Sequence, residues 1–336
     1  VVLIKNGVLI GEQYAEGFDK NSYGTSWSMA KSFYAALIGI SIDRGEINGL
    51  DDKVNLYLDY FNDERSKITI RDLLNMSSGL EYPENQHENM FFLNDHLEYS
   101  KSIGVEKEAN TVFEYNNVNS MLLGDILEKA TGKKADLLLN ERILDPIGVK
   151  NSTVWTDNAG NPLAYCCIDM SARDYSRFGL LFSRNGNWNG NQLISKDFVD
   201  ETFTEYWDVT PQWWTNAKRG YTLHWWVSKN DEEGSIFNAS GKFGQYIFVD
   251  RENDIIFTRI TKYHPTPGSI QDWGRLSRVE VNNIGRWLKV TRFLEKVGIL
   301  DADDLKTPNT RKDGESKEFY EIYGEVIDSI ADLSRN

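Results

Sequence analysis

A serine and a lysine three positions apart, Ser28 and Lys31, have the types and spacing from which an acyl-transfer site can be built. They stand just before residues 33–42, whose length and all-round hydrophobicity predict a buried helix. On that helix the two side chains share a face, with the hydroxyl at the positive end of the helix dipole. The lysine can accept the serine proton if apolar burial and cationic neighbours lower its pKa. The same spacing also fits a capping serine beside a lysine whose stem packs on apolar surface.

A tyrosine followed by two asparagines, Tyr115-Asn116-Asn117, is the second candidate group. Its phenol can shuttle a proton between a nucleophile and a leaving group, while the amide positions Lys31 or a substrate carbonyl. A similar Tyr60-Phe61-Asn62 competes with it, but belongs to an aromatic stretch that is typical of packing. Tyr115 is favoured because it lies just ahead of a predicted helix ending at Thr131-Gly132, a good C-cap. A structural role stays open for the tyrosine alone.

The third candidate group is the segment Ala239-Ser240-Gly241-Lys242-Phe243-Gly244-Gln245, which leads into a predicted strand over residues 246–249. Its small residues let an edge strand approach the nucleophile closely. A backbone N–H of that strand can then pair with the N–H of Ser28 as an oxyanion hole. Taken alone, the segment is equally a glycine-containing turn.

The order of the predicted elements indicates an α+β fold. Residues 1–15 hold Asn6-Gly7 between two β-rich runs, the strongest short signal for a hairpin. Residues 246–249 and 255–260 predict a second hairpin. Because mostly helical sequence separates these groups, we expect one antiparallel sheet built from both chain ends, with flanking helices and an inserted helical subdomain. A doubly wound parallel sheet is not expected.

Other segments complete this prediction. Helices are expected over residues 120–127, 171–181, 273–290 and 318–333, with a further one opening at 68–74. The polar stretch over residues 81–110 is dotted with aromatics and is long for a connection without secondary structure. It is therefore a candidate lid or binding loop.

Composition narrows the classes of function. The chain has 51 acidic and 37 basic residues, and its net charge of -14 argues against nucleic acid and membrane-surface partners. No apolar run reaches the roughly 18 residues of a membrane-spanning helix, and residues 1–30 lack a signal peptide. The chain opens on a strand-like run at Val1, so upstream residues decide between a cytoplasmic and an exported protein. Cys166 and Cys167 are adjacent, where an ordinary disulfide would be strained, and are predicted to be buried thiols.

Motifs of several enzyme classes are absent: a Walker loop, Gly-x-Gly-x-x-Gly after a strand, His-Glu-x-x-His and Gly-x-Ser-x-Gly. The histidines show no metal-ligand spacing, and they are His87, His96, His224 and His264. We therefore expect neither a metal nor an organic cofactor. His224, beside two tryptophans, is the one histidine to test near a site.

In this order and in these settings, the three groups resemble those of the penicillin-recognising serine hydrolases, which share the β-lactamase-like fold. The resemblance is nearest to class C β-lactamases, family VIII carboxylesterases and 6-aminohexanoate-dimer hydrolases. It covers about residues 1–300 and includes "ITIRDLLNMSSGL", "FEYNNVNSMLLGDILEKATG" and "DMSARDYSRFGLLFSRNGNWNGNQLIS". It implies a catalytic domain over residues 1–300, with an α/β part (about 1–50 and 150–300) and a helical part (about 51–149). Residues 301–336 would be a polar extension with a short helix.

The resemblance also implies roles for individual residues. Ser28 would be the acylated nucleophile, Lys31 its base and Tyr115 the partner in proton transfer. Asn117 would be the third residue of the Tyr-x-Asn element. In the third motif, at Gly241, the following residue Lys242 would supply the second oxyanion N–H.

The third motif departs from the family pattern, because Ala239 stands where β-lactamases and peptidases have a basic residue that helps anchor a substrate carboxylate. Strong β-lactam turnover is therefore not expected. The Lys242 side chain is three positions away and need not point the same way. The Gly-x-x-Gly-Gln form of residues 241–245 looks more like the amide-oligomer hydrolases and esterases. Candidate pocket walls, with core packing as the alternative for the aromatic ones, are Tyr82, Trp213, Trp214, His224 and Trp226.

We expect a serine hydrolase that cleaves ester or amide bonds of small acyl substrates through an acyl-enzyme at Ser28. One alternative keeps the fold and makes the protein a β-lactamase or penicillin-binding D-alanyl peptidase. The other is a catalytically silent family member that binds a peptide-like ligand. The sequence leaves the oligomeric state open.

Overall fold

A computed structural model of the protein describes residues 1–83, 86–91, 93–203, 207–213, 218–229, 236–242, 244–261 and 317–335, with single positions between 290 and 299. The helix predicted over 273–290 lies almost entirely outside the described residues. Within them, no helix is both long and apolar enough to cross a bilayer.

The central element is an antiparallel sheet to which the described residues contribute eight strands. Its order is β2 (Val8–Glu12), β1 (Val2–Lys5), β13 (Ile255–Arg259), β12 (Gln245–Asp250), β11 (Ile236–Gly241), β10 (Trp225–Lys229), β9 (Lys218–Thr222) and β8 (Trp207–Asp208). The first hairpin turns at Asn6 and Gly7, which both have positive φ, as the Asn-Gly signal predicts. Because β1 pairs with β13, strands far apart in the sequence share one sheet. The predicted α+β architecture is confirmed.

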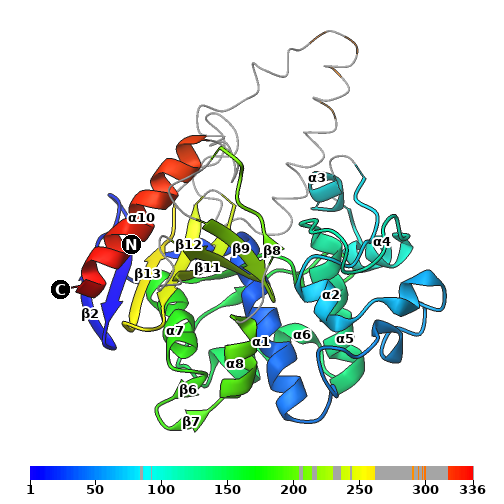
Figure 1. Ribbon diagram of the computed structural model, residues 1–336, viewed down its shortest axis with the longest axis horizontal. Coiled ribbons are helices and arrows are strands. Elements are labelled where there is room, and N and C mark those ends of the chain that lie inside the picture. Colours follow the sequence, from blue (N-terminus) through cyan, green and yellow to red (C-terminus); the bar gives the residue numbers. More distant parts are fainter. Residues whose placement is uncertain are drawn as a thin grey trace.

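The two faces of the sheet are covered by different helices (Figure 1). In β12, Tyr246 and Phe248 belong to a cluster with the C-terminal helix α10 (Lys317–Arg335), whereas Ile247 and Val249 join the main core. This alternation follows from the two-residue period of a strand. On the main-core side lie α7 (Ala172–Ser183) and α1 (Ala30–Asp43).

Short elements join the sheet to the helices. A small sheet contains β3 (Tyr23–Thr25), β5 (Ile168–Ser171) and β4 (Thr153–Val154), and a two-stranded one contains β6 (Asn187–Trp188) and β7 (Asn191–Gln192). The 3-10 turns are η1 (Trp27–Met29), η2 (Val54–Leu56) and η3 (Glu64–Lys67), and α8 (Lys196–Thr202) follows β7. The predicted helix over 171–181 is confirmed as α7, whose cap Ser171 accepts a hydrogen bond from the N–H of Asp174.

The inserted helical part lies beside this sheet (Figure 1). Its elements are α2 (Ile70–Leu74), α3 (Gln86–Phe91), α4 (His96–Ser102), α5 (Asn117–Thr131), α6 (Ala135–Leu139) and the π-helix η4 (Asn140–Leu144). Thr69 and Asp72 form a capping box at the start of α2. Helix α5 ends at Gly132, whose φ of 71° is the left-handed conformation expected of a glycine C-cap.

Three sequence predictions need correction. Cys166 and Cys167 are buried as predicted, but their sulfurs form a disulfide instead of remaining thiols. Cys167 has a φ of 78°, so the backbone turns at this residue. Strand β11 is an internal strand where β10 pairs with it, from Ile236 to Asn238, but that pairing does not extend to residues 239–241. Residues 81–110 are not without secondary structure, since α3 and α4 lie within them; a lid or binding role for this stretch stays a prediction.

Candidate active site

Ser28 and Lys31 meet where η1 runs into α1. Apolar side chains occupy every side of α1, so the helix is buried and carries Lys31, which is 1% exposed, inside with it. The Lys31 Nζ lies 3.0 Å from the Ser28 Oγ and donates a second hydrogen bond, 2.8 Å long, to the Tyr165 carbonyl. Trp27, directly before Ser28, has a φ of 47°, a strained conformation for a bulky residue and one that clusters at functional sites.

The surroundings of Lys31 favour a neutral amine. Burial lowers the pKa of Lys31 well below its ordinary value. Among the described residues, its hydrogen bonds go to a hydroxyl and a carbonyl, and neither group carries a negative charge that would hold a proton on the nitrogen. A neutral amine offers a lone pair to the proton of Ser28, so Lys31 has the properties of a general base.

Tyr115 is positioned by the start of α5. The next residue, Asn116, caps that helix by accepting a hydrogen bond from the N–H of Val118. The Lys31 Nζ lies 4.9 Å from the centre of the Tyr115 ring. Burial raises the pKa of Tyr115 to about 12, although a hydrogen bond with Ser28 acts in the opposite direction. The phenol therefore keeps its proton near neutral pH and can donate it, whereas Lys31 can accept one.

The C-terminal end of β11 lies against the segment that carries Ser28. A Cβ at position 241 would stand 2.1 Å from the carbonyl oxygen of Ser26, so only glycine permits this approach. The neighbouring Lys242 is exposed, whereas Ala239, two residues before Gly241, is fully buried in the main core. The backbone at Gly241 thus packs closely against the segment that carries Ser28.

Asn117 begins α5 and is 8% exposed. Its side-chain oxygen is buried and makes no hydrogen bond within the described part of the chain. A buried acceptor in this state carries an energetic cost unless a ligand or water supplies a donor.

The aromatic candidates occupy different places. Trp226 stacks on Tyr115 with ring centres 5.7 Å apart, and Tyr82 is partly buried and near enough to raise the pKa of Tyr115 slightly. Trp213 is 50% exposed and packs edge-on against Tyr320 of α10 instead. Trp214 lies outside the described residues.

His224 lies one layer behind the site. Its ring nitrogens meet the Ser120 hydroxyl at 2.9 Å and the Tyr221 hydroxyl at 3.3 Å, and its carbonyl accepts a hydrogen bond from Ser32. Burial is the main cause that lowers the pKa of His224 to about 3. It is a neutral, buried imidazole rather than an open pocket wall.

Sequence reasoning missed two neighbours of the catalytic candidates. The Tyr165 carbonyl holds Lys31, but a backbone carbonyl carries no side-chain signal. The guanidinium of Arg219 lies 3.8 Å from the centre of the Trp226 ring and donates a hydrogen bond to the Tyr320 hydroxyl. The sequence of strand β9, which contains Arg219, does not indicate that helix α10 packs over this side chain.

The arrangement suits nucleophilic acyl transfer: a hydroxyl, an amine in its basic form, a protonated phenol and a closely packed backbone edge. Among the described residues, no group of three or more His, Cys, Asp or Glu side chains is placed to hold a metal ion.

The sequence matches the Beta-lactamase family model over residues 1–279. A 6-aminohexanoate-dimer hydrolase of Paenarthrobacter ureafaciens is 21% identical over 320 residues, which cover 88% of this chain and 78% of that protein. A solved structure from Bacillus anthracis, assigned as a 6-aminohexanoate-dimer hydrolase, has a TM-score of 0.67 at 22% identity and covers 88% of this chain and 79% of its own.

A solved family VIII carboxylesterase has a TM-score of 0.58 at 14% identity, covering 79% of this chain and 83% of its own. At these identities the solved structures show a shared fold, which confirms the β-lactamase-like architecture. Since the family model spans most of the 336 residues, this chain belongs to the Beta-lactamase family, and the relatives named above are hydrolases.

Proposed function

We propose that the protein is a serine hydrolase that cleaves ester or amide bonds of small acyl substrates through an acyl-enzyme on Ser28. The observation that carries this proposal is the 3.0 Å contact between the Ser28 Oγ and the Nζ of a fully buried Lys31. Burying the Lys31 amine costs free energy. A Ser28 that served only as a helix cap would not require a buried amine beside it.

In the proposed acylation step, Lys31 takes the hydroxyl proton as the Ser28 Oγ bonds to the substrate carbonyl carbon. The backbone N–H groups of Ser28 and Lys242 donate to the resulting oxyanion. Tyr115 delivers a proton to the leaving alcohol or amine as its bond to the acyl carbon breaks, and receives the proton held by Lys31. In deacylation a water molecule attacks the ester of Ser28, and the same groups return the proton to Oγ.

The surroundings of the site support an ester or amide substrate over a β-lactam. Ala239 is buried in the main core and offers no charge to a substrate carboxylate. Tyr115 and Trp226, which stack on each other and are each partly exposed, give this region aromatic character that is compatible with acyl groups carrying apolar chains. A relative named as a 6-aminohexanoate-dimer hydrolase and a neighbour named as a carboxylesterase are in keeping with this substrate class.

Initial rates on three substrate classes test the proposal. p-Nitrophenyl butyrate, a linear aliphatic amide and nitrocefin would be offered to the wild-type protein and to Ser28→Ala. We expect ester or amide turnover that Ser28→Ala abolishes, with nitrocefin hydrolysis much slower. Faster nitrocefin turnover would make the protein a β-lactamase. Absence of any Ser28-dependent turnover would leave the silent ligand-binding alternative.

A further inference from the structure

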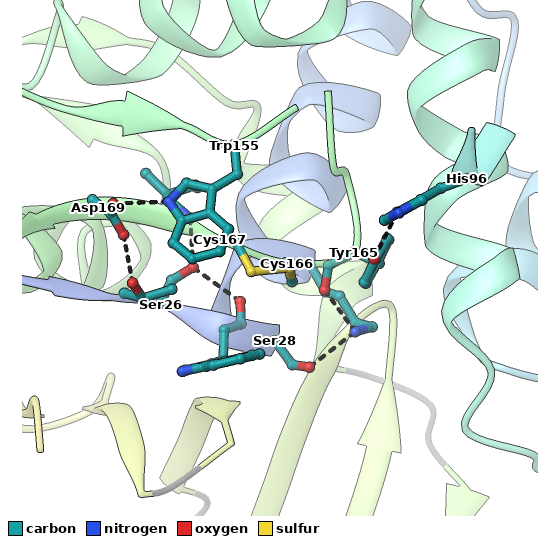
Figure 2. Close-up of a disulfide and its surroundings, with 12 residues drawn as sticks. Ser26, Ser28, His96, Trp155, Tyr165, Cys166, Cys167 and Asp169 are labelled. Atoms are coloured by element: carbon teal, nitrogen blue, oxygen red, sulfur yellow. Dashed lines mark hydrogen bonds between the residues drawn. A yellow bond between two sulfur atoms is a disulfide. The ribbon is translucent and has the colours of Figure 1, made fainter. Parts of the chain in front are cut away.

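The bonded pair of neighbouring cysteines lies directly behind the catalytic candidates (Figure 2). Cys166 and Cys167 are 3% and 0% exposed, and they separate Tyr165 from the start of β5. A bond between adjacent sulfurs closes a small ring around one peptide unit, so the backbone on either side has little freedom while the bond is intact. Cys167 is held in a left-handed conformation, with a φ of 78°, that residues with a side chain seldom adopt.

On one side, this ring continues into the group that holds the base. The Tyr165 carbonyl accepts the 2.8 Å hydrogen bond from Lys31. The Tyr165 phenol meets the Nδ1 of His96 at 2.9 Å (Figure 2). The Nε2 of His96 meets the Leu93 carbonyl at 3.1 Å. The side chain of Tyr165 is therefore fixed to the helical part of the protein, independently of its carbonyl.

On the other side, the ring continues into the segment that holds the nucleophile. The N–H of Cys167 donates to the Trp27 carbonyl at 3.3 Å. Next to it, the N–H of Ile168 donates to the Ser26 hydroxyl at 2.9 Å, and the N–H of Ser26 donates to the Ile168 carbonyl at 2.8 Å. Residues 26 and 27 immediately precede Ser28, so these hydrogen bonds determine the position of the proposed nucleophile.

The strand beyond the ring is itself anchored. Asp169 accepts hydrogen bonds from Thr25 at 2.6 Å and from the Trp155 indole at 2.8 Å (Figure 2). The two cysteines connect these anchored residues, Tyr165 and Asp169. Their backbone is also held by hydrogen bonds from the Cys166 N–H to the Leu163 carbonyl at 3.1 Å and from the Trp155 N–H to the Cys167 carbonyl at 2.9 Å. The disulfide therefore acts together with these bonds on the position of the carbonyl behind Lys31 relative to the backbone before Ser28.

We propose that the Cys166–Cys167 disulfide positions the Ser28–Lys31 pair for reaction, so that reduction of this bond by a dithiol slows catalysis. In the reduction, the dithiol gives two electrons and two protons; the bond between the sulfurs breaks, both cysteines become thiols and the reductant becomes a cyclic disulfide. Cys167 then loses the covalent constraint on its left-handed conformation, and the Tyr165 carbonyl shifts away from Lys31. The two cysteines are positioning residues, since they touch neither the substrate nor the Ser28 hydroxyl in the proposed reaction.

The experiment compares wild-type protein before and after dithiothreitol with the double variant Cys166→Ser/Cys167→Ser. We expect kcat to fall by roughly tenfold to a hundredfold on reduction, with little change in KM, since misplaced groups slow the chemical step more than binding. The double variant should show this lowered kcat with or without dithiothreitol, and reoxidation should restore only the wild-type protein. Iodoacetamide labelling in denaturant, after the dithiothreitol has been removed, followed by mass measurement, shows which samples carry free thiols.

A pH profile separates positioning from a general loss of structure. If the carbonyl behind Lys31 shifts, water reaches the amine, and the acid limb of kcat/KM moves to higher pH in the double variant. A second variant, Cys166→Ser/Cys167→Gly, places a residue at 167 that adopts positive φ without strain, and should recover part of the lost kcat. This glycine variant also allows the effect of losing the disulfide to be measured if the serine variant fails to fold.

An unchanged kcat and an unchanged acid limb in a folded variant without the disulfide would overturn the inference. The inference rests on the proposed function, and Ser28→Ala keeps the two apart. Hydrolysis that survives Ser28→Ala refutes the proposed function. Hydrolysis that depends on Ser28 but ignores the disulfide refutes only the positioning role.

Discussion

Replacing Lys31 by methionine is expected to lower kcat/KM for ester hydrolysis roughly a thousandfold, because the group that accepts the Ser28 proton is lost. Methionine is close to lysine in length and suits an apolar interior, so the main core around α1 should stay packed. In the wild-type protein, kcat/KM should rise with pH as the Lys31 ammonium loses its proton, and the lowered pKa places this rise well below the ordinary range of lysine. Steady-state kinetics across pH provide the measurement.

The same variant makes a prediction about stability. An unfolded lysine has a pKa near about 10.4, whereas burial lowers the pKa of Lys31 in the folded chain. Between these two values the unfolded chain binds more protons, so acidification destabilises the wild-type fold. Lys31→Met removes this term. Its free energy of unfolding, relative to wild type, should therefore be most favourable at low pH and should decline as the pH approaches about 10.

Urea unfolding at several pH values measures this difference. A relative stability that does not vary with pH would show that Lys31 titrates normally, and would contradict the assignment of Lys31 as the base. Near-UV circular dichroism of the variant controls for a loss of tertiary structure. A folded Lys31→Met variant that retains wild-type kcat/KM would also contradict the assignment of Lys31 as the base.

Replacing Tyr115 by phenylalanine is expected to lower kcat about a hundredfold for amides and alkyl esters. The ring and its stacking on Trp226 are kept, and only the hydroxyl is removed. With a pKa of about 12, that hydroxyl is protonated near neutral pH and is the group placed to protonate a leaving amine or alcohol. A p-nitrophenolate leaves without protonation, so p-nitrophenyl esters should lose much less rate.

The ratio of the two losses is the informative quantity. Rates of Tyr115→Phe and wild type would be compared on an alkyl ester and on a p-nitrophenyl ester of the same acid. Tyr60→Phe is the matched control, because the Tyr60 hydroxyl bonds to Asp125 and lies in the aromatic stretch assigned to packing. Equal losses on both esters in Tyr115→Phe would mean that the phenol serves Ser28 and not the leaving group.

The local features of this site were predictable from the sequence. The three-residue separation of Ser28 and Lys31 on a buried helix determines their contact, because helical geometry acts over one turn. Tyr115 lies ahead of a helix as predicted, because the glycine signal for the helix end at Gly132 is also local. The hairpin at Asn6-Gly7 is predictable for the same reason.

Non-local features were not predictable in this way. The Tyr165 carbonyl reaches Lys31 across 134 positions, and every residue has a carbonyl. The pairing of β11 with β10 over Ile236–Asn238 depends on strands that meet only in the folded sheet, and the sequence of either strand alone does not specify its partner. The disulfide between the adjacent cysteines was not predictable from the sequence. It occurs with a left-handed conformation at Cys167, and neither glycine nor asparagine stands at this position to signal such a turn.

Covalent labelling by an alkyl fluorophosphonate tests whether Ser28 is an activated nucleophile. Intact-mass measurement should show one adduct per chain, peptide mapping should place it on Ser28, and Ser28→Ala should take up no reagent. Labelling of Lys31→Met should be strongly slowed. Modification of a different residue, or unchanged modification of Ser28→Ala, would contradict the account.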